Sequence, residues 1–244
     1  MKASTVQSYQ VHREQESTMR TLAVGDIHGC YHALTTLEAF AKFTPEDHII
    51  TLGDHIHRGP DSRSVVQWLI DRKRQGHLTA LRGNHECVFQ AAITSELDRE
   101  TWLSFGGDQM LASYDAQSIE QIPVAHRSFL QNGLKDFYEN ETHFCVHANA
   151  CEDLELKDQP KRMLFWKKFG EVKPHQSGRV MVCGHTPQIS GYPKDVGHAI
   201  CIDTAAARKG WLTCLDLDTR YCWQANEAGN TRSFSLDAAE RIAI

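Results

Sequence analysis

The sequence has no apolar run that approaches the ~18 residues of a membrane span, and its N-terminus has no hydrophobic segment like that of a signal peptide. We therefore expect no membrane partner and a cytoplasmic location. Long basic runs are also missing, because the longest, at 72–74, has three residues and the net charge is −5. Binding a phosphate backbone needs a concentrated basic surface, so we expect no nucleic-acid partner.

Cysteine pairs are absent as well. The eight cysteines are scattered without a Cys-x-x-Cys motif, and several lie inside apolar runs. This distribution favours reduced, buried thiols in a cytosolic protein over a disulfide framework. With 41% apolar and 23% charged residues, the 244-residue chain has the composition of a globular protein with one substantial core.

Three apolar runs each end on a glycine that is followed by a side chain able to bind a metal. The first run leads to Asp26 and His28, the second to Asp54, and the third to Asn84 and His85. The intervals are about 30 residues, close to the length of one strand–helix unit. In a parallel sheet with right-handed crossovers, this spacing brings the three turns to one edge, where ligands of open α/β sheets bind.

The patterns between and after these runs predict the rest of the fold. Helical periodicity at 32–43, and from Asp61 or Ser62 to Gly76, gives a βαβαβ unit, and 87–132 is expected to form a helical cap. The later predicted elements are a hairpin at 137–146 and strands at 199–202, 212–217 and 221–223.

These elements predict an α/β (α+β) fold in which two packed mixed β-sheets form a sandwich flanked by helices. The metal site is expected at the C-terminal ends of the strands. Residues 1–18 are polar and without periodicity, so we expect a disordered or appended arm there and a single domain over 19–244.

Six candidate metal ligands follow apolar runs and offer oxygen or nitrogen. Carboxylate, imidazole and amide donors together suit divalent ions such as Mn, Fe, Zn or Co. Six donors are too many for one ion with an open position, so we expect two ions that share a carboxylate. The candidates are Asp26, His28, Asp54, Asn84, His147 and His185.

Five motifs make the chain resemble the calcineurin-like metallophosphoesterases, in the phosphoprotein-phosphatase branch. They are Gly-Asp-Ile-His-Gly at 25–29, Gly-Asp-x-x-x-Arg-Gly at 53–59, Gly-Asn-His-Glu at 83–86, Val-His-Ala at 146–148 and Gly-His-Thr at 184–186. The similarity spans about residues 19–217. The segments 102–114 and 203–206 further resemble small bacterial serine/threonine protein phosphatases.

The resemblance implies a role for each strand-end residue. Asp26, His28 and Asp54 would hold one metal, and Asp54, Asn84, His147 and His185 the other. The metals, with Mn the ion we favour, would generate the hydroxide that attacks phosphorus in line. His85 would protonate the leaving oxygen, and Arg58 would grip the phosphate. The implied catalytic residues are thus His85, Asp54 and Arg58, and the candidate substrate contacts are Arg58, Lys168, Asn84 and His57.

Two positions depart from the family pattern. His57 stands where relatives have an Asp that accepts a hydrogen bond from the general-acid histidine, and Lys168 stands where relatives tend to have a second arginine. Lysine keeps the charge but loses the planar fork. A neutral imidazole supports a protonated His85 less well than a carboxylate does, so we expect weaker protonation of poor leaving groups.

Three functions stay open at this point. The first is a serine/threonine-type protein phosphatase that hydrolyses phosphomonoesters with two metal ions. The second is a dinucleoside-polyphosphate hydrolase acting on diadenosine tetraphosphate, whose known members also lack the acid at position 57. The third is a catalytically weak pseudophosphatase that binds phosphoproteins, although a binding module has little need of a complete ligand set.

Overall fold

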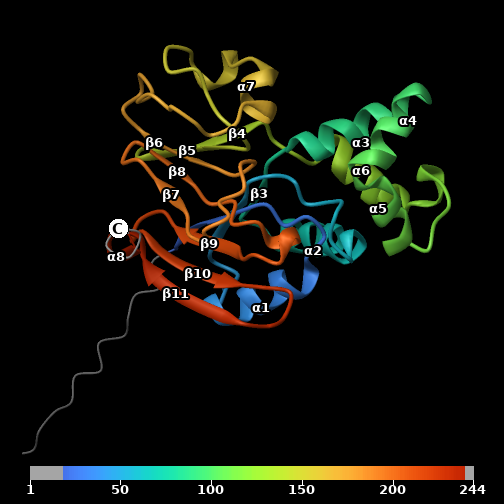
Figure 1. Cartoon of the computed structure of the whole chain (residues 1–244), viewed down its shortest axis with the longest axis horizontal. Coiled ribbons are helices and arrows are strands. Elements are labelled where there is room, and N and C mark those ends of the chain that lie inside the picture. The colour runs from blue at the N-terminus through green and yellow to red at the C-terminus, as the bar shows by residue number, and fades with distance from the viewer. Residues whose placement is uncertain (1–18, 240–244) are drawn as a thin grey trace, which may run out of the picture.

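Two β-sheets packed face to face form the centre of the molecule, with helices on the outside (Figure 1). The computed structural model describes residues 19–239, so the predicted arm at 1–18 lies outside the described residues. The expected sandwich of two mixed sheets flanked by helices is confirmed.

The first sheet carries the predicted βαβαβ unit. Its parallel part consists of β1 (Thr21–Val24), β2 (His48–Thr51) and β3 (Leu78–Ala80), joined by α1 (Tyr31–Ala41) and α2 (Ser62–Gln75). The side chain of Asp61 caps α2 by accepting a 2.9 Å hydrogen bond from the backbone N–H of Ser64. Three antiparallel strands extend the sheet beyond β1: β9 (Leu212–Asp216), β10 (Tyr221–Ala225) and β11 (Thr231–Ser235).

The second sheet has five strands, and its central three are parallel. The predicted hairpin is present, with its turn residues held by the side chain of Asn140, which accepts hydrogen bonds from the backbone of Thr142 and His143. In spatial order the strands are β4 (Phe137–Glu139), β5 (His143–Val146), β6 (Val180–Cys183), β8 (Ala199–Cys201) and β7 (Lys194–Asp195).

The helices after β3 stand to one side of the sheets (Figure 1). A kinked segment at Leu103–Gly107, in which Gly106 has a non-helical backbone, joins the second and third of them. These helices are α3 (Asn84–Thr94), α4 (Leu97–Trp102), α5 (Asp108–Ser113) and α6 (Val124–Asn132). The remaining helical elements are α7 (Lys161–Trp166), α8 (Leu236–Ala239) and single 3₁₀ turns at Ile119–Gln121, Leu156–Asp158 and Ala206–Arg208.

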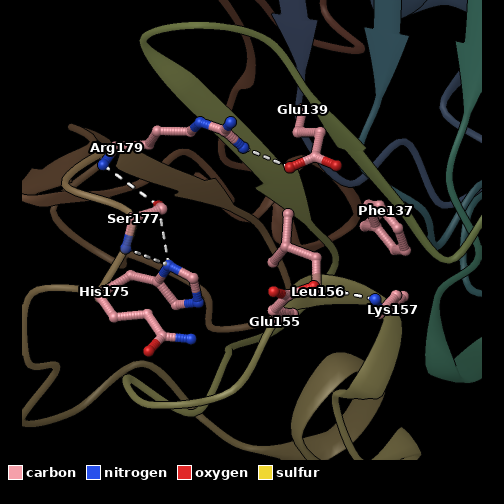
Figure 2. Close-up of a pocket in the computed structure, with 9 residues that line it drawn as sticks. Phe137, Glu139, Glu155, Leu156, Lys157, His175, Ser177 and Arg179 are labelled. Atoms are coloured by element: carbon pink, nitrogen blue, oxygen red, sulfur yellow. Dashed lines mark hydrogen bonds and ion pairs between the residues drawn. The ribbon is translucent and has the colours of Figure 1, made fainter.

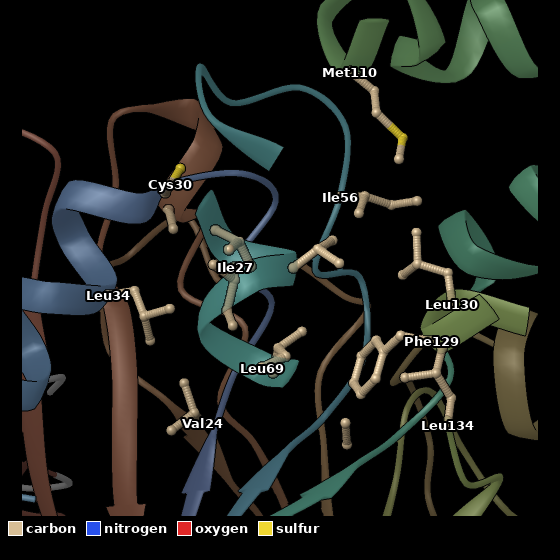
Figure 3. Packing of buried hydrophobic residues seen from close by; sticks show 14 of the residues in the cluster. Val24, Ile27, Cys30, Leu34, Ile56, Leu69, Met110, Phe129, Leu130 and Leu134 are labelled. Carbon is tan, nitrogen blue, oxygen red and sulfur yellow. The ribbon is translucent and has the colours of Figure 1, made fainter. Parts of the chain in front are cut away.

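Side chains of β1 alternate between two cores. In β1, Leu22 and Val24 pack against α1 and α2, in the cluster that Figure 3 shows. The residue between them, Ala23, packs with Ile50 and with Val182 of the second sheet, in the core between the two sheets. This period of two fixes the register of β1. In the described part of the chain, no helix is long and apolar enough to span a membrane.

Candidate metal centre

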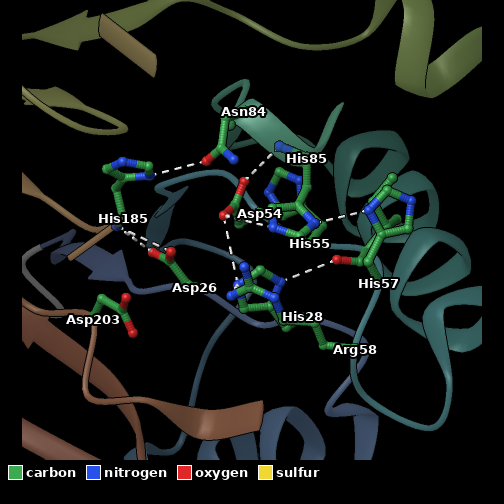
Figure 4. Close-up of polar contacts among 12 residues, drawn as sticks. Asp26, His28, Asp54, His55, His57, Arg58, Asn84, His85, His185 and Asp203 are labelled. Atoms are coloured by element: carbon green, nitrogen blue, oxygen red, sulfur yellow. Dashed lines mark hydrogen bonds and ion pairs between the residues drawn. The ribbon is translucent and has the colours of Figure 1, made fainter. Parts of the chain in front are cut away.

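The predicted strand-end residues meet at the ends of strands from both sheets. Figure 4 shows five of them close together, namely Asp26, His28, Asp54, Asn84 and His185. Asp54 lies at the middle of the group, with its carboxylate oxygens 3.5 Å from Nε2 of His28 and 3.4 Å from Nε2 of His147. Oδ1 of Asn84 lies 3.0 Å from Nε2 of His147 and 2.9 Å from Nδ1 of His185. Residues that follow strands of both sheets therefore build the site.

Three of the imidazoles are each oriented by a backbone carbonyl. His28 and His147 direct Nδ1 at the carbonyls of Ile56 and Leu52, at 3.1 and 2.9 Å, and His185 directs Nε2 at the carbonyl of Trp166, at 3.2 Å. A carbonyl can only accept, so these nitrogens carry the protons. The other nitrogen of each ring then points a lone pair at the oxygens of Asp54 and Asn84. Metal-ligating histidines are usually held in this way.

Two overlapping groups of donors result. One contains His28, Asp54 and His85, and the other contains Asp54, His147 and His185; within each group the donor atoms lie within 4.8 Å of one another. Asp54 belongs to both. The carboxylate of Asp26 lies outside both groups and accepts the backbone N–H of His185 at 3.0 and 3.1 Å.

The ionisation of these side chains suits a cation. Burial lowers the pKa of His147 to about 3 and also lowers the pKa of His28 and His185, so the rings are neutral near pH 7. Burial, reinforced by neighbouring carboxylates, raises the pKa of Asp26 and Asp54. A divalent cation would relieve both costs, because it binds neutral imidazole and ionised carboxylate. The donor set therefore fits a metal.

Positively charged side chains line the pocket that opens onto these donor groups. The pocket has a volume of about 440 Å³, and its lining includes Asp54, Arg58, Lys168, His185 and Arg208. Arg58 donates a 2.9 Å hydrogen bond to Nε2 of His28, and the structure thus places its guanidinium within the site. Arg208 lies two residues after the segment 203–206 and was not among the residues that we predicted for the site.

His57 lies beneath the site instead of lining the pocket. Its side chain is fully buried, and its Nδ1 is 2.8 Å from Nδ1 of His85. Its Nε2 accepts a 2.8 Å hydrogen bond from the indole N–H of Trp102 in α4. We expected a substrate contact for His57, whereas in this structure its partners are His85 and Trp102.

Glu86 is a positioning residue that our sequence reasoning missed, although it belongs to the Gly-Asn-His-Glu motif. Its buried carboxylate accepts backbone N–H groups from Asp54, His55 and Gly83 at 2.9, 2.8 and 2.8 Å. These bonds tie the turn after β2 to the start of α3. Burial alone would raise the pKa of Glu86, but the nearby His55 and the backbone N–H of Gly83 lower it below its ordinary value.

Glu86→Gln is expected to destabilise the metal-free protein by about 3 kcal/mol, because the amide group would point a donor at backbone donors. Because the pKa of Glu86 is lower in the folded state than in the unfolded state, its carboxylate stabilises the protein at pH values above the ordinary carboxyl pKa. This stabilisation is lost as the pH falls. The deficit of the variant should therefore be full at pH 7 and shrink below about pH 4. Urea unfolding at several pH values measures it.

The control for that experiment is Glu38→Gln, which changes a partly buried carboxylate that accepts one indole N–H from Trp68. It should cost less than about 1 kcal/mol, since the amide oxygen can still accept that bond. Equal stability of the Glu86 variant and the wild type would show that the carboxylate does not organise the two loops.

Another pocket of about 440 Å³ lies at strand β4 and contains no such convergence (Figure 2). Its charged side chains pair with each other, Arg179 with Glu139 and Lys157 with Glu155. His175 there shares hydrogen bonds with Ser177 and the carbonyl of Leu154. The strand-end group is therefore the better candidate for a catalytic site.

The fold and this site define a metal-dependent phosphoesterase, and comparison with known proteins supports the assignment. The profile of the calcineurin-like phosphoesterases matches residues 19–210, so the chain belongs to that family. Serine/threonine-protein phosphatase 2 of Escherichia coli is 37% identical over 78% of this chain and 89% of its own length. Serine/threonine-protein phosphatase 1 of Salmonella typhimurium is 31% identical over 67% of this chain and 69% of its own length.

Other relatives carry a different activity in their names. A symmetrical bis(5'-nucleosyl)-tetraphosphatase of Methylobacillus flagellatus is 39% identical over 69 residues, which are 28% of this chain and 24% of that protein. A cold-active protein-tyrosine phosphatase of Shewanella has a similar solved structure, with a TM-score of 0.63 and 16% identity over 88% of this chain and 80% of that one. The second similarity concerns the fold alone.

Proposed function

We propose that the protein is a binuclear-metal phosphomonoesterase that removes phosphate from phosphoserine or phosphothreonine in proteins. The observation that carries this proposal is the convergence of three carbonyl-held imidazoles on the oxygens of Asp54 and Asn84. The similarity to two serine/threonine-protein phosphatases over most of the chain supports the choice of substrate.

The proposed ligands are the six residues predicted from the strand ends, with Asp54 shared between two ions. Manganese is the ion we favour, and iron, zinc and cobalt suit the same donors. Such ions, when bound, lower the pKa of water and neutralise charge on the phosphoryl oxygens. Asp26 would need to turn its carboxylate from the backbone of His185 toward His28 to join the first group.

The remaining residues act on the substrate directly. Arg58 can bind two phosphoryl oxygens with its planar fork, and Lys168 and Arg208 add positive charge at the same pocket. His85 is fully buried, and its Nε2 lies 3.9 Å from the Asp54 carboxylate without a hydrogen-bond partner among the described residues. We assign this nitrogen the role of donor to the leaving oxygen.

A dinucleoside-polyphosphate hydrolase is the second candidate. It is favoured by His57, because a phosphoanhydride leaving group needs less protonation than a serine alkoxide does. The named tetraphosphatase relative matches only 69 residues, whereas the protein phosphatases match the cap as well. The pseudophosphatase alternative gains nothing from these relatives, whose names are those of enzymes.

A substrate panel on the metal-reconstituted protein tests the proposal. EDTA should abolish activity, and manganese should restore it better than iron, zinc or cobalt. Turnover should be higher on phosphoserine and phosphothreonine peptides than on diadenosine tetraphosphate. Faster cleavage of the dinucleotide would favour the second candidate, and activity that is indifferent to EDTA would contradict both.

A further inference from the structure

A chain of buried hydrogen bonds runs from the cap to the reaction centre. The indole N–H of Trp102 donates to Nε2 of His57, and Nδ1 of His57 faces Nδ1 of His85, with both distances 2.8 Å. The side chains are 2%, 0% and 0% exposed. Water is therefore excluded from the chain, and its three members have to satisfy one another.

The direction of each bond follows from the first donor. Indole nitrogen has a proton and no lone pair to offer, so Nε2 of His57 must be the unprotonated acceptor. Burial lowers the pKa of His57 to about 3, which keeps the ring neutral with its single proton on Nδ1. That proton is donated to Nδ1 of His85. The proton of a neutral His85 must then reside on Nε2, the nitrogen that faces Asp54.

We propose that Trp102 is a positioning residue of the active site, which sets the tautomers of His57 and His85 and thereby directs the Nε2–H of His85 toward the scissile phosphate. The inference takes from the proposed function only the role of His85 as donor to the leaving oxygen. The hydrogen bond of Trp102 goes to His57, which is not one of the proposed metal ligands.

The local backbone is built to let the indole reach His57. Trp102 ends α4, and the chain after it kinks at Gly106 before α5 begins. A Cβ on Gly107 would lie 2.6 Å from the ring of Trp102. Gly106 has φ +105°, and a Cβ there would lie 2.9 Å from the backbone nitrogen of Arg58 and from Cβ of His57. The two glycines thus permit the close approach.

The hydrogen bond between His57 and His85 runs in the opposite direction to the bond that a carboxylate at position 57 would make. A carboxylate accepts from Nδ1–H of the histidine, whereas His57 donates to Nδ1. His85 is then a neutral hydrogen-bond donor and not a source of a whole proton. Compared with a site that has a carboxylate at position 57, this site should protonate serine and threonine alkoxides less well, whereas the leaving oxygens of aryl phosphates and phosphoanhydrides need that proton less.

Nitrogen NMR of the metal-free, full-length protein with labelled histidine tests the assignment without substrate, because the two ring nitrogens report the tautomer. His57→Gln and His85→Gln assign the signals. In the wild type we expect the proton on Nδ1 of His57 and on Nε2 of His85. A proton on Nε2 of His57 in the wild type would overturn the proposal, whatever the enzyme hydrolyses.

Trp102→Phe removes the donor and keeps an aromatic ring. Both tautomers of His57, and with them both tautomers of His85, should then be populated. Because part of His85 then lacks a proton on Nε2, kcat on a phosphoserine peptide relative to p-nitrophenyl phosphate should fall by up to roughly tenfold with little change in KM, part of the ~10²–10⁴ that general acids contribute. Trp68→Phe is the matched control, since its indole also donates one 2.8 Å bond, to Glu38. Unchanged tautomers in Trp102→Phe, or equal effects of both variants, would refute the role.

Discussion

Asp54→Asn is expected to lose most of its bound metal and more than about 100-fold in kcat, a larger effect than the ~10–100-fold that loss of an outer-shell partner causes. Asp54 is the one residue common to both donor groups, and the amide would withdraw a negative charge from each. Metal content by elemental analysis and turnover of p-nitrophenyl phosphate measure the two losses.

The same substitution should leave the metal-free protein at least as stable as the wild type. Burial raises the pKa of Asp54, so the ionised carboxylate is costly without a cation, and an asparagine oxygen can still accept the backbone N–H of His85 at 3.0 Å in its place. The control is Asp61→Asn, which keeps a good helix cap outside the site. Full activity and full metal content in Asp54→Asn would disprove the binuclear assignment.

His57→Asp is expected to raise kcat on phosphoserine and phosphothreonine peptides roughly 10- to 100-fold, while changing turnover of p-nitrophenyl phosphate little. The carboxylate can accept both the indole N–H of Trp102 and an Nδ1–H of His85. It would raise the pKa of His85, which burial and the nearby His28, His57 and Arg58 now lower. Because the acid then stays protonated to higher pH, the basic limb of the pH profile should move upward.

His57→Asn is the matched control for that gain. Asparagine has nearly the shape of aspartate but no charge, so it should not reproduce the selective increase or the shift of the basic limb. Equal gains with Asp and Asn, or a loss on both substrates at unchanged metal content, would show that His57 serves the site in some other way.

The sequence predicted the edge at which the site lies because that edge follows from strand ends. Asp54, Asn84 and His185 each follow an apolar run and a glycine. Residues in that position lie at the same edge of the sheets, whatever the details of side-chain packing. Asp26 was expected beside His28, and the structure places it against the backbone of His185; its role as a ligand stays a prediction.

Contacts that depend on tertiary packing could not be read from the sequence. Trp102 and His57 are 45 residues apart, and helical periodicity marks which face of α4 is buried but not what that face meets. The edge strands β7 and β11 were also outside the predicted strands, since β7 has two residues and β11 is mostly polar and only partly buried. The domain limits at 1–18 and 19–244 stay predictions.

The division of the site between two sheets has a consequence for folding. Asp26, His28, Asp54 and Asn84 follow strands of the first sheet, whereas His147 and His185 follow strands of the second. Asp26 and His185, which meet in the folded chain, are 159 positions apart. An unfolded chain cannot assemble these donors, so an ion that binds them adds its binding free energy to the stability of the native state alone. Removal of the bound ion by a chelator would then weaken the association of the two sheets.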